Sequence, residues 1–259
     1  MINKSINNQT GLTESSNDID TLNSYLETKA LKHNYYRTYE TKEHFENILK
    51  TSCIYLTDGH NWADKDDFDK IQSDKGSKAF VKCFSYAASE SVAMWMLYGG
   101  INSGGSLVNY KRRLITDIVG NKDNYCFEIQ NEEKSWETID KKYIKKIRLY
   151  DVLYYSKNST GYSVKRSDEF VTIHNDISNV NFIKKYPWNY EMECRLVVYL
   201  DKKYLKDKGL SESSVLRIKV DSLKDIISVI CSPIEKSTSS KDYKNTTSDL
   251  FPLKWEINR

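Results

Sequence analysis

The chain has 259 residues, and its 39 Lys and Arg against 36 Asp and Glu give a formal net charge of +3. So small a charge on this length does not by itself indicate a nucleic-acid or membrane-surface partner. The composition is 39% hydrophobic and includes 19 tyrosines, which predicts a folded chain with a tyrosine-rich core. No internal repeat and no Pro-rich or Gly/Ser-rich linker divides the sequence, so we expect a single domain over residues 23–259.

Residues 1–22 are almost wholly polar and are expected to form a flexible tail. After them, local patterns predict a strand, a helix, two strands and a second helix. The expected ranges are 35–39, 41–50, 54–56, 79–86 and a helix that is capped by Ser89 and ends at Gly99-Gly100.

The second half of the chain is expected to be rich in strands. Predicted strands cover residues 106–111, 125–130, 147–155, 190–200, 215–220, 226–232 and 253–257. A loose helical pattern covers 168–186, and 237–249 is expected to be a loop or a marginal helix. Because long helices do not alternate regularly with strands, we expect an α+β fold with a twisted mixed or antiparallel sheet flanked by short helices.

The sequence also predicts a compartment and the absence of a metal. It shows no signal-peptide pattern and no long apolar run, and its five cysteines are far apart with no CxxC pair. We therefore expect a cytoplasmic protein with reduced thiols and no membrane partner. No metal is expected, because the histidines lack ligand spacing and the aspartate-rich run at 64–69 lacks the Gly and Glu of a calcium loop.

The segment 188–198 is the most informative for chemistry. On a strand, alternation would place Glu191, Glu193 and Arg195 on one face. Two neighbouring carboxylates disfavour joint ionisation, whereas the nearby guanidinium of Arg195 favours their ionised form. Such a row can hold a carboxylate that binds ribose hydroxyls or a developing cation. The alternative interpretation is a solvated sheet face with a weak surface ion pair.

Two other segments carry candidate binding residues. Ser85 ends a predicted strand and leads into the helix that carries Trp95 and Tyr98, whose rings could stack on a planar ligand or form a core pair. Arg37 and Tyr39 share a face of the first strand. An Arg flanked by aromatics suits a phosphate or carboxylate, although it could equally pair with a glutamate of segment 188–198.

The segment 141–166 supports a different function. It contains eight Lys and Arg against one acid, with five interleaved tyrosines. Basic and aromatic residues together are typical of surfaces that bind single-stranded nucleic acid. The alternative is a solvated face with half-buried tyrosines.

Several short segments together resemble a bacterial family known only as domain of unknown function 2971. The match covers about residues 34–257 and departs from the family pattern at 61–65. The most specific element is Trp-x-Tyr-Glu-x-Glu-x-Arg, at residues 188–195. The other matching segments are Tyr36-Arg37-Thr38-Tyr39, Asp67-Phe68-Asp69, Cys83-Phe84-Ser85, Met94-Trp95 with Tyr98, Gly104-Gly105 and Val229-Ile230-Cys231-Ser232-Pro233.

The layout of this family looks like that of the mono-ADP-ribosyltransferase fold. That resemblance implies a split sheet around a cleft for NAD, which is the substrate. It implies that Arg37 or Tyr39 holds the dinucleotide and that Ser85 or Tyr98 orients it. A late glutamate, Glu193 or Glu191, would bind the ribose and stabilise the oxocarbenium formed as nicotinamide leaves. Trp95 and Arg195 complete the expected cofactor-binding set.

The expected function is therefore an NAD-dependent ADP-ribosyltransferase or NAD glycohydrolase. The acceptor would be a nucleic acid, a protein or water, and the family resemblance allows a setting in bacterial phage defence or toxin action. The alternative is a nucleic-acid-binding module or nuclease that uses segment 141–166.

Overall fold

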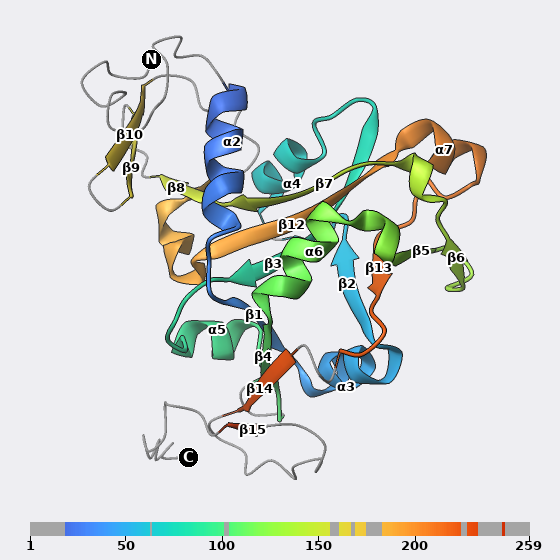
Figure 1. The fold of residues 1–259 in the computed structure, drawn as a ribbon, viewed down its shortest axis with the longest axis horizontal. Helices are drawn as coiled ribbons and strands as arrows, with labels where there is room; N and C mark the ends of the chain where they lie inside the picture. Colours follow the sequence, from blue (N-terminus) through green and yellow to red (C-terminus); the bar gives the residue numbers. More distant parts are fainter. Residues whose placement is uncertain are drawn as a thin grey trace.

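The computed structural model describes residues 19–62, 64–100, 104–155, 161–166, 169–174, 183–223, 227–232 and 245–246. Within these ranges the chain forms an α+β fold, in which a mostly antiparallel main sheet of eleven strands is flanked by short helices (Figure 1). This confirms the expected fold class at that level. No helix in the described ranges is long and apolar enough to cross a bilayer.

The main sheet has nine strands along one path and two more that continue from β3. The path is β15 (Asn245–Thr246), β14 (Ile227–Cys231), β4 (Ser106–Tyr110), β1 (Tyr36–Glu40), β3 (Ser77–Ser85), β2 (Cys53–Thr57), β13 (Val215–Lys219), β5 (Cys126–Gln130) and β6 (Trp136–Thr138). The two further strands are β12 (Glu193–Asp201), next to β3, and β7 (Ile144–Asp151), next to β12.

The remaining elements are two small sheets and several short helices. The small sheets pair β8 (Leu153–Tyr155) with β11 (Ile183–Lys185) and β9 (Gly161–Arg166) with β10 (Glu169–His174). The α-helices are α2 (Ile19–Ala30), α3 (Lys42–Thr51), α4 (Lys65–Ile71), α5 (Val92–Leu97), α6 (Arg112–Gly120) and α7 (Lys202–Asp207). The 3₁₀ helices are η1 (Lys122–Asn124), η2 (Lys141–Tyr143) and η3 (Tyr186–Glu191).

The main sheet divides at β3. Strand β12 pairs with β3 along its whole length, from Glu193 opposite Ser85 to Asp201 opposite Ser77, and so occupies one edge. Strands β1 and β2 must share the other edge, because β1 pairs there at Ser85 and β2 pairs there at Val81. The sheet therefore continues in two directions, through β1, β4 and β14 and through β2, β13 and β5 (Figure 1).

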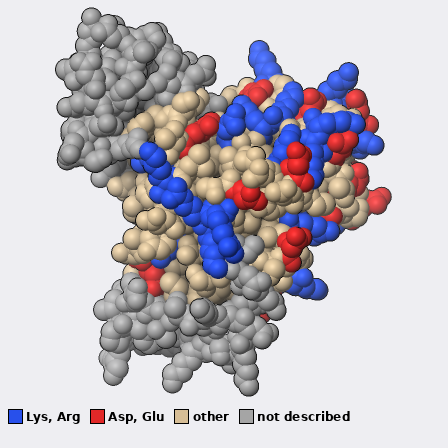
Figure 2. Space-filling model, viewed as in Figure 1, with Lys and Arg blue, Asp and Glu red and all other residues tan. Residues whose placement is uncertain are grey.

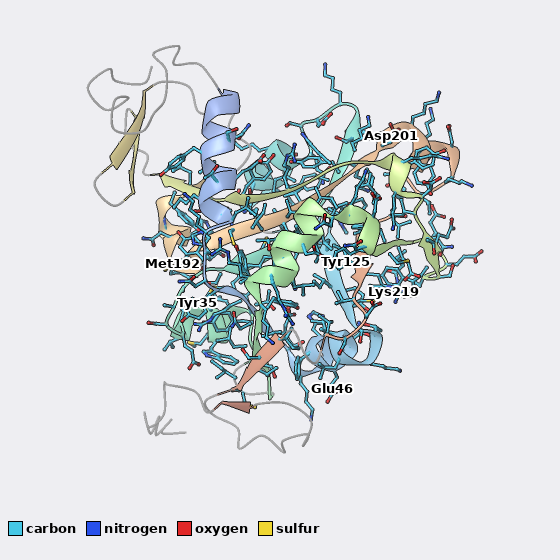
Figure 3. The ribbon with its side chains drawn as sticks, in the orientation of Figure 1. Tyr35, Glu46, Tyr125, Met192, Asp201 and Lys219 are labelled. Carbon is cyan, nitrogen blue, oxygen red and sulfur yellow. The ribbon has the colours of Figure 1, made fainter. Side chains whose placement is uncertain are left out.

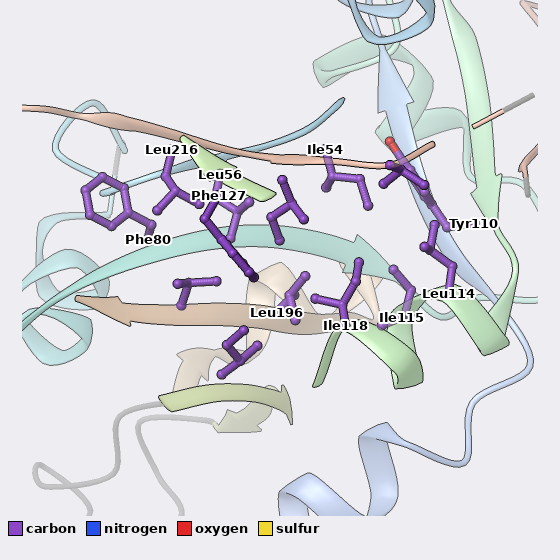
Figure 4. Packing of buried hydrophobic residues seen from close by; sticks show 14 of the residues in the cluster. Ile54, Leu56, Phe80, Tyr110, Leu114, Ile115, Ile118, Phe127, Leu196 and Leu216 are labelled. Atoms are coloured by element: carbon purple, nitrogen blue, oxygen red, sulfur yellow. The ribbon is translucent and has the colours of Figure 1, made fainter. Parts of the chain in front are cut away.

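The main core lies between helix α6 and the sheet. Leu114, Ile115 and Ile118 of α6 are buried against apolar side chains from both branches of the sheet (Figure 4). Tyrosine contributes to this core as expected: Tyr36 is fully buried and donates a 2.7 Å hydrogen bond to the carbonyl oxygen of Ala30. Burial of these side chains is the main favourable contribution to folding.

Several local predictions need correction. The helix expected over 168–186 is wrong for the described part of that range, because alternating Val171 and Ile173 suit a strand and Glu169–His174 pairs with β9; residues 175–182 lie outside the described ranges. Helix α5 is capped by Ser91 rather than Ser89, since the Ser91 hydroxyl accepts from the Met94 amide. Helix α2 begins inside the expected tail, and helix α6 was not predicted. Residues 1–18 and the expected strand 253–257 lie outside the described ranges.

Helix α2 is anchored on β7 by a buried charge. The carboxylate of Asp151 is fully buried, with its oxygens 2.6 Å from His33 Nε2 and 2.9 Å from Lys29 Nζ. The ring of His33 also stacks on Tyr86, with ring centres 4.0 Å apart and planes at 5°. Because the Asp151 carboxylate has left water, the ion pair with Lys29 and the hydrogen bond to His33 offset the cost of burying it.

The first prediction concerns this anchor. Replacing Asp151→Asn removes the buried negative charge, leaves the Lys29 ammonium without its ionic partner and weakens the hydrogen bond to His33, so we expect a loss of about 3 kcal/mol in the free energy of unfolding. Urea titration followed by circular dichroism measures this. Asp123→Asn at an exposed position is the control and should change stability by less than about 0.5 kcal/mol. Equal stability of the two variants would refute the anchor.

Candidate functional site

The centre of the candidate site is the guanidinium of Arg195, which β12 carries into the interior. Arg195 is fully buried and forms two 2.6 Å bonds to the carboxylate of Asp67, which α4 supplies. Its Nε donates to Glu193 Oε1 at 2.6 Å, and the Trp62 ring lies 5.1 Å from the guanidinium carbon. A charge so deeply buried is tolerated only when oppositely charged groups lie within hydrogen-bond distance of it, as the two carboxylates do here.

The ammonium group of Lys184, on β11, joins a second carboxylate to this centre. Lys184 Nζ lies 2.7 Å from Glu191 Oε2 and 2.9 Å from Glu193 Oε2, with Asp67 Oδ2 farther away at 3.9 Å. The Tyr98 hydroxyl donates to the other oxygen of Glu191 at 2.8 Å. We call Asp67, Lys184, Glu191, Glu193 and Arg195 the ion cluster.

The two glutamates reach the ion cluster from different local structures. Residue Glu191 ends the 3₁₀ helix η3, whereas Glu193 begins strand β12. Between them lies Met192, labelled in Figure 3. It adopts a left-handed backbone with φ +43°, and its side chain is 39% exposed. The expectation that Glu191 shares a strand face with Glu193 and Arg195 is therefore wrong for Glu191, because the turn at Met192 interrupts the alternation.

Their different partners move the pKa values of the two glutamates in opposite directions. Burial and the nearby charge of Glu193 raise the pKa of Glu191, and Lys184 and Tyr98 only partly oppose this. Burial alone would also raise the pKa of Glu193, but Arg195 and Lys184 overcome it and hold that pKa well below the usual range. Glu193 therefore stays ionised, while Glu191 is the group that takes up a proton more readily.

Three predicted site residues lie in one row across neighbouring strands. Arg37 on β1 is paired with Ser85 on β3, which is paired with Glu193 on β12. Directly paired residues of antiparallel strands point to the same face, so these side chains share one face of the sheet. Asn109 on β4 extends the row, because it is the partner of Arg37 on the other side.

Arg37 has an unused donor in this row. Its terminal nitrogen donates to the carbonyl oxygens of Ala87 and Ala88 at 3.0 and 2.6 Å, and the Tyr35 ring lies 4.2 Å from its guanidinium carbon. Its Nε is buried without a hydrogen-bond partner among the described residues, and so is Oδ1 of Asn109. Buried polar atoms without partners are uncommon and are places where a ligand could bind.

The predicted aromatic residues divide between the core and the site. Trp95 is fully buried, packs edge-on against Tyr39 at 5.1 Å and donates its indole N–H to Glu90. Tyr39 accepts a hydrogen bond from the backbone amide of Ser91. Both rings therefore support α5, and neither is open to a stacking ligand in this conformation. Only Tyr98, which is 41% exposed, reaches the ion cluster.

A cavity of about 400 Å³ lies where β1 and β2 separate. We call it the split cavity. Its wall includes the facing side chains Glu40, Lys82, Cys83 and Trp62, and none of the predicted site residues lines it. Two of its lining residues border the ion cluster, since the Cys83 thiol is hydrogen-bonded to Glu193 and the Trp62 ring covers Arg195. The glutamates are thus neighbours of the cavity without facing it.

Sequence reasoning missed three members of this arrangement. Asp67 belongs to a motif that had suggested only calcium or a family resemblance, and the need of a buried Arg195 for carboxylate partners could have indicated it. Lys184 and Trp62 gave no comparable signal, because their positions depend on how β11 and the loop before α4 fold over the sheet. No group of His, Cys, Asp and Glu in the described part of the chain could hold a metal ion.

Comparison with known proteins finds no relative of this chain. No family model matches the chain, and neither the curated proteins nor the solved structures give a significant match. The resemblance to domain of unknown function 2971 and to mono-ADP-ribosyltransferases therefore stays a prediction.

The second prediction follows from the depressed pKa of Glu193. Its ionised form stabilises the folded chain above the ordinary carboxyl pKa of 4.5, and this contribution is lost as pH falls. Near pH 7 we expect Glu193→Gln to lower the free energy of unfolding by about 3 kcal/mol. The difference from the wild type should shrink below about pH 4.5, as urea titrations across the pH range would show.

The matched control is Glu212→Gln, at an exposed position outside the site. It should follow the wild type within about 0.5 kcal/mol at every pH. A difference for Glu193→Gln that does not change with pH would mean that the carboxylate is not held ionised by the cluster.

Proposed function

We propose that the chain cleaves the bond between nicotinamide and ribose in NAD and transfers ADP-ribose to an acceptor or to water. The observation that carries this proposal is the row of Arg37, Ser85 and Glu193 across three adjacent strands, with an unpaired donor on Arg37. A cation for phosphate, a hydroxyl for orientation and a carboxylate for the ribose are the groups that this reaction needs.

Glu193 acts on the ribose in this mechanism. As the C–N bond breaks, its electron pair leaves with neutral nicotinamide and positive charge develops on the ribose. A carboxylate that stays ionised stabilises this charge, and Arg195 and Lys184 keep Glu193 ionised. Arg195 uses its donors on Asp67 and Glu193, so it positions Glu193 instead of binding the substrate.

Glu191 serves the second half of the reaction. Water or an acceptor hydroxyl attacks the ribose carbon and loses a proton, which needs a base nearby. Glu191 suits this role because its pKa is raised and because it lies on the side of the cluster that Tyr98 connects to the surface. Two carboxyl groups whose environments separate their pKa values are a common acid–base arrangement.

The alternative function, nucleic-acid binding through segment 141–166, receives less support. Its described cations are largely engaged locally: Lys145 lies 3.1 Å from Asp201, and Arg148 lies 3.3 Å from Glu27. Tyr143 stacks on Tyr204 and Tyr150 is buried, so neither offers an open stacking face. On the face in Figure 2, Lys and Arg are interspersed with Asp and Glu instead of forming one basic surface.

The third prediction tests the proposed reaction. The purified chain is incubated with NAD, with and without protein and nucleic-acid acceptors, and free nicotinamide is measured. We expect release by the wild type and a loss of at least about a hundredfold for Glu193→Gln. Because that variant also loses stability, Ser85→Ala is included: it should keep the fold and reduce release by about tenfold or more.

The control is Glu137→Gln on exposed strand β6, which should release nicotinamide at the wild-type rate. Intact NAD with every acceptor would refute the proposal. So would full activity in folded Glu193→Gln. Binding of single-stranded nucleic acid that weakens steeply with salt, with no nicotinamide release, would favour the alternative.

A further inference from the structure

The split cavity carries a second set of polar groups, apart from the row at Glu193. Lys82 and Glu40 face each other on its wall, with Nζ 2.7 Å from Oε1. Their side chains are only 16% and 8% exposed, so this pair is largely removed from water. A buried pair of this kind is more sensitive to a ligand than a surface pair, because little solvent screens it.

The ion pair leaves hydrogen-bonding capacity on both partners. The second carboxylate oxygen of Glu40 lies 3.9 Å from His44 Nδ1, which is beyond hydrogen-bond distance. The ammonium of Lys82 has three donors, and the bond to Glu40 uses one of them. The cavity therefore presents a carboxylate that can accept from two neighbouring donors, next to an ammonium that can donate to an acceptor.

The rest of the wall suits a flat ring of moderate size. Trp62 and Tyr55 contribute aromatic surface, and Ile48, Val81 and Val215 contribute apolar surface. A volume of about 400 Å³ lies in the range of small-molecule sites. The rim is open on the side of α3, where His44 and Asn47 are exposed.

We propose that the split cavity binds a guanine base. Guanine presents two adjacent N–H donors and a carbonyl oxygen along one edge, which match the carboxylate of Glu40 and the ammonium of Lys82. Adenine and cytosine each present one amino group, which can donate to the carboxylate, beside a ring nitrogen that can only accept. Each of these bases therefore leaves part of the Glu40–Lys82 pair without a partner. Discrimination then comes from buried groups that only guanine satisfies.

This site uses groups other than those of the proposed NAD chemistry. It uses Glu40 and Lys82, whereas the reaction uses Arg37, Ser85 and Glu193. Guanosine binding could therefore be present without nicotinamide release, and the reverse also holds. The two proposals fail on different measurements.

The fourth prediction is the affinity of the full chain for free nucleosides, measured by isothermal titration calorimetry. We expect guanosine to bind at least about tenfold more tightly than adenosine or cytidine, since it adds a hydrogen bond to a charged group. Inosine keeps the ring N–H and the carbonyl oxygen but lacks the exocyclic amine, so it should bind with intermediate affinity. Equal affinities, or no binding of guanosine at about 1 mM, would overturn the proposal.

Two kinds of variant locate the binding. The double variant Glu40→Gln with Lys82→Met removes both charges together, so that no buried ion is left unpaired, and should lose guanosine selectivity. In case that variant fails to fold, Asn47→Trp places a bulky ring at the exposed rim and should block binding while the core stays unchanged. Its control is Glu46→Trp, on the same helix but outside the cavity lining, which should bind normally. Guanosine binding that is unchanged in folded Asn47→Trp would place the ligand elsewhere and refute the assignment.

Discussion

The guanidinium of Arg195 imposes the strongest constraint on this structure. It lies fully buried on strand β12, between β3 and the edge strand β7, where an unpaired charge would cost several kcal/mol. Asp67 offsets that cost from α4, and Glu193 offsets it from the same strand. The position of α4 over the sheet is therefore fixed by charge pairing as well as by apolar contact, and an early segment of the chain is bound to a late one.

The ion cluster gives the two glutamates different roles because their partners differ. Glu193 contacts the permanent charge of Arg195 directly, so its ionisation is a condition of the folded state. Glu191 contacts Lys184 and the partly exposed Tyr98, and no guanidinium in the described part of the chain pairs with it. The carboxylate of Glu193 is thus fixed by the fold. The carboxylate of Glu191 can respond to a proton or a ligand without loss of the pair between Arg195 and Glu193.

The sequence predicted those elements whose pattern is local. Strands β1, β3 and β13 and helix α3 fall close to their expected ranges, because alternation and capping are decided within a few residues. The position of Glu191 depends on the left-handed turn at Met192, which no periodicity indicates. The alignment of Arg37 with Glu193 depends on β1 and β12 pairing with opposite edges of β3 at Ser85, and such long-range pairing is not encoded in any one segment.

The ion cluster and the split cavity are physically connected through two shared side chains. Trp62 lies against the guanidinium of Arg195 and also lines the cavity, and the Cys83 thiol lies between the cavity and Glu193. Trp62 and Cys83 are therefore the side chains through which a ligand in the cavity would reach the surroundings of Glu193. Any coupling between occupancy of the cavity and protonation of the carboxylates would be reciprocal, so protonation would alter the affinity for the ligand by the same factor. Arg195 holds the pKa of Glu193 low, whereas burial raises the pKa of Glu191, so Glu191 is the carboxyl group through which such coupling would act.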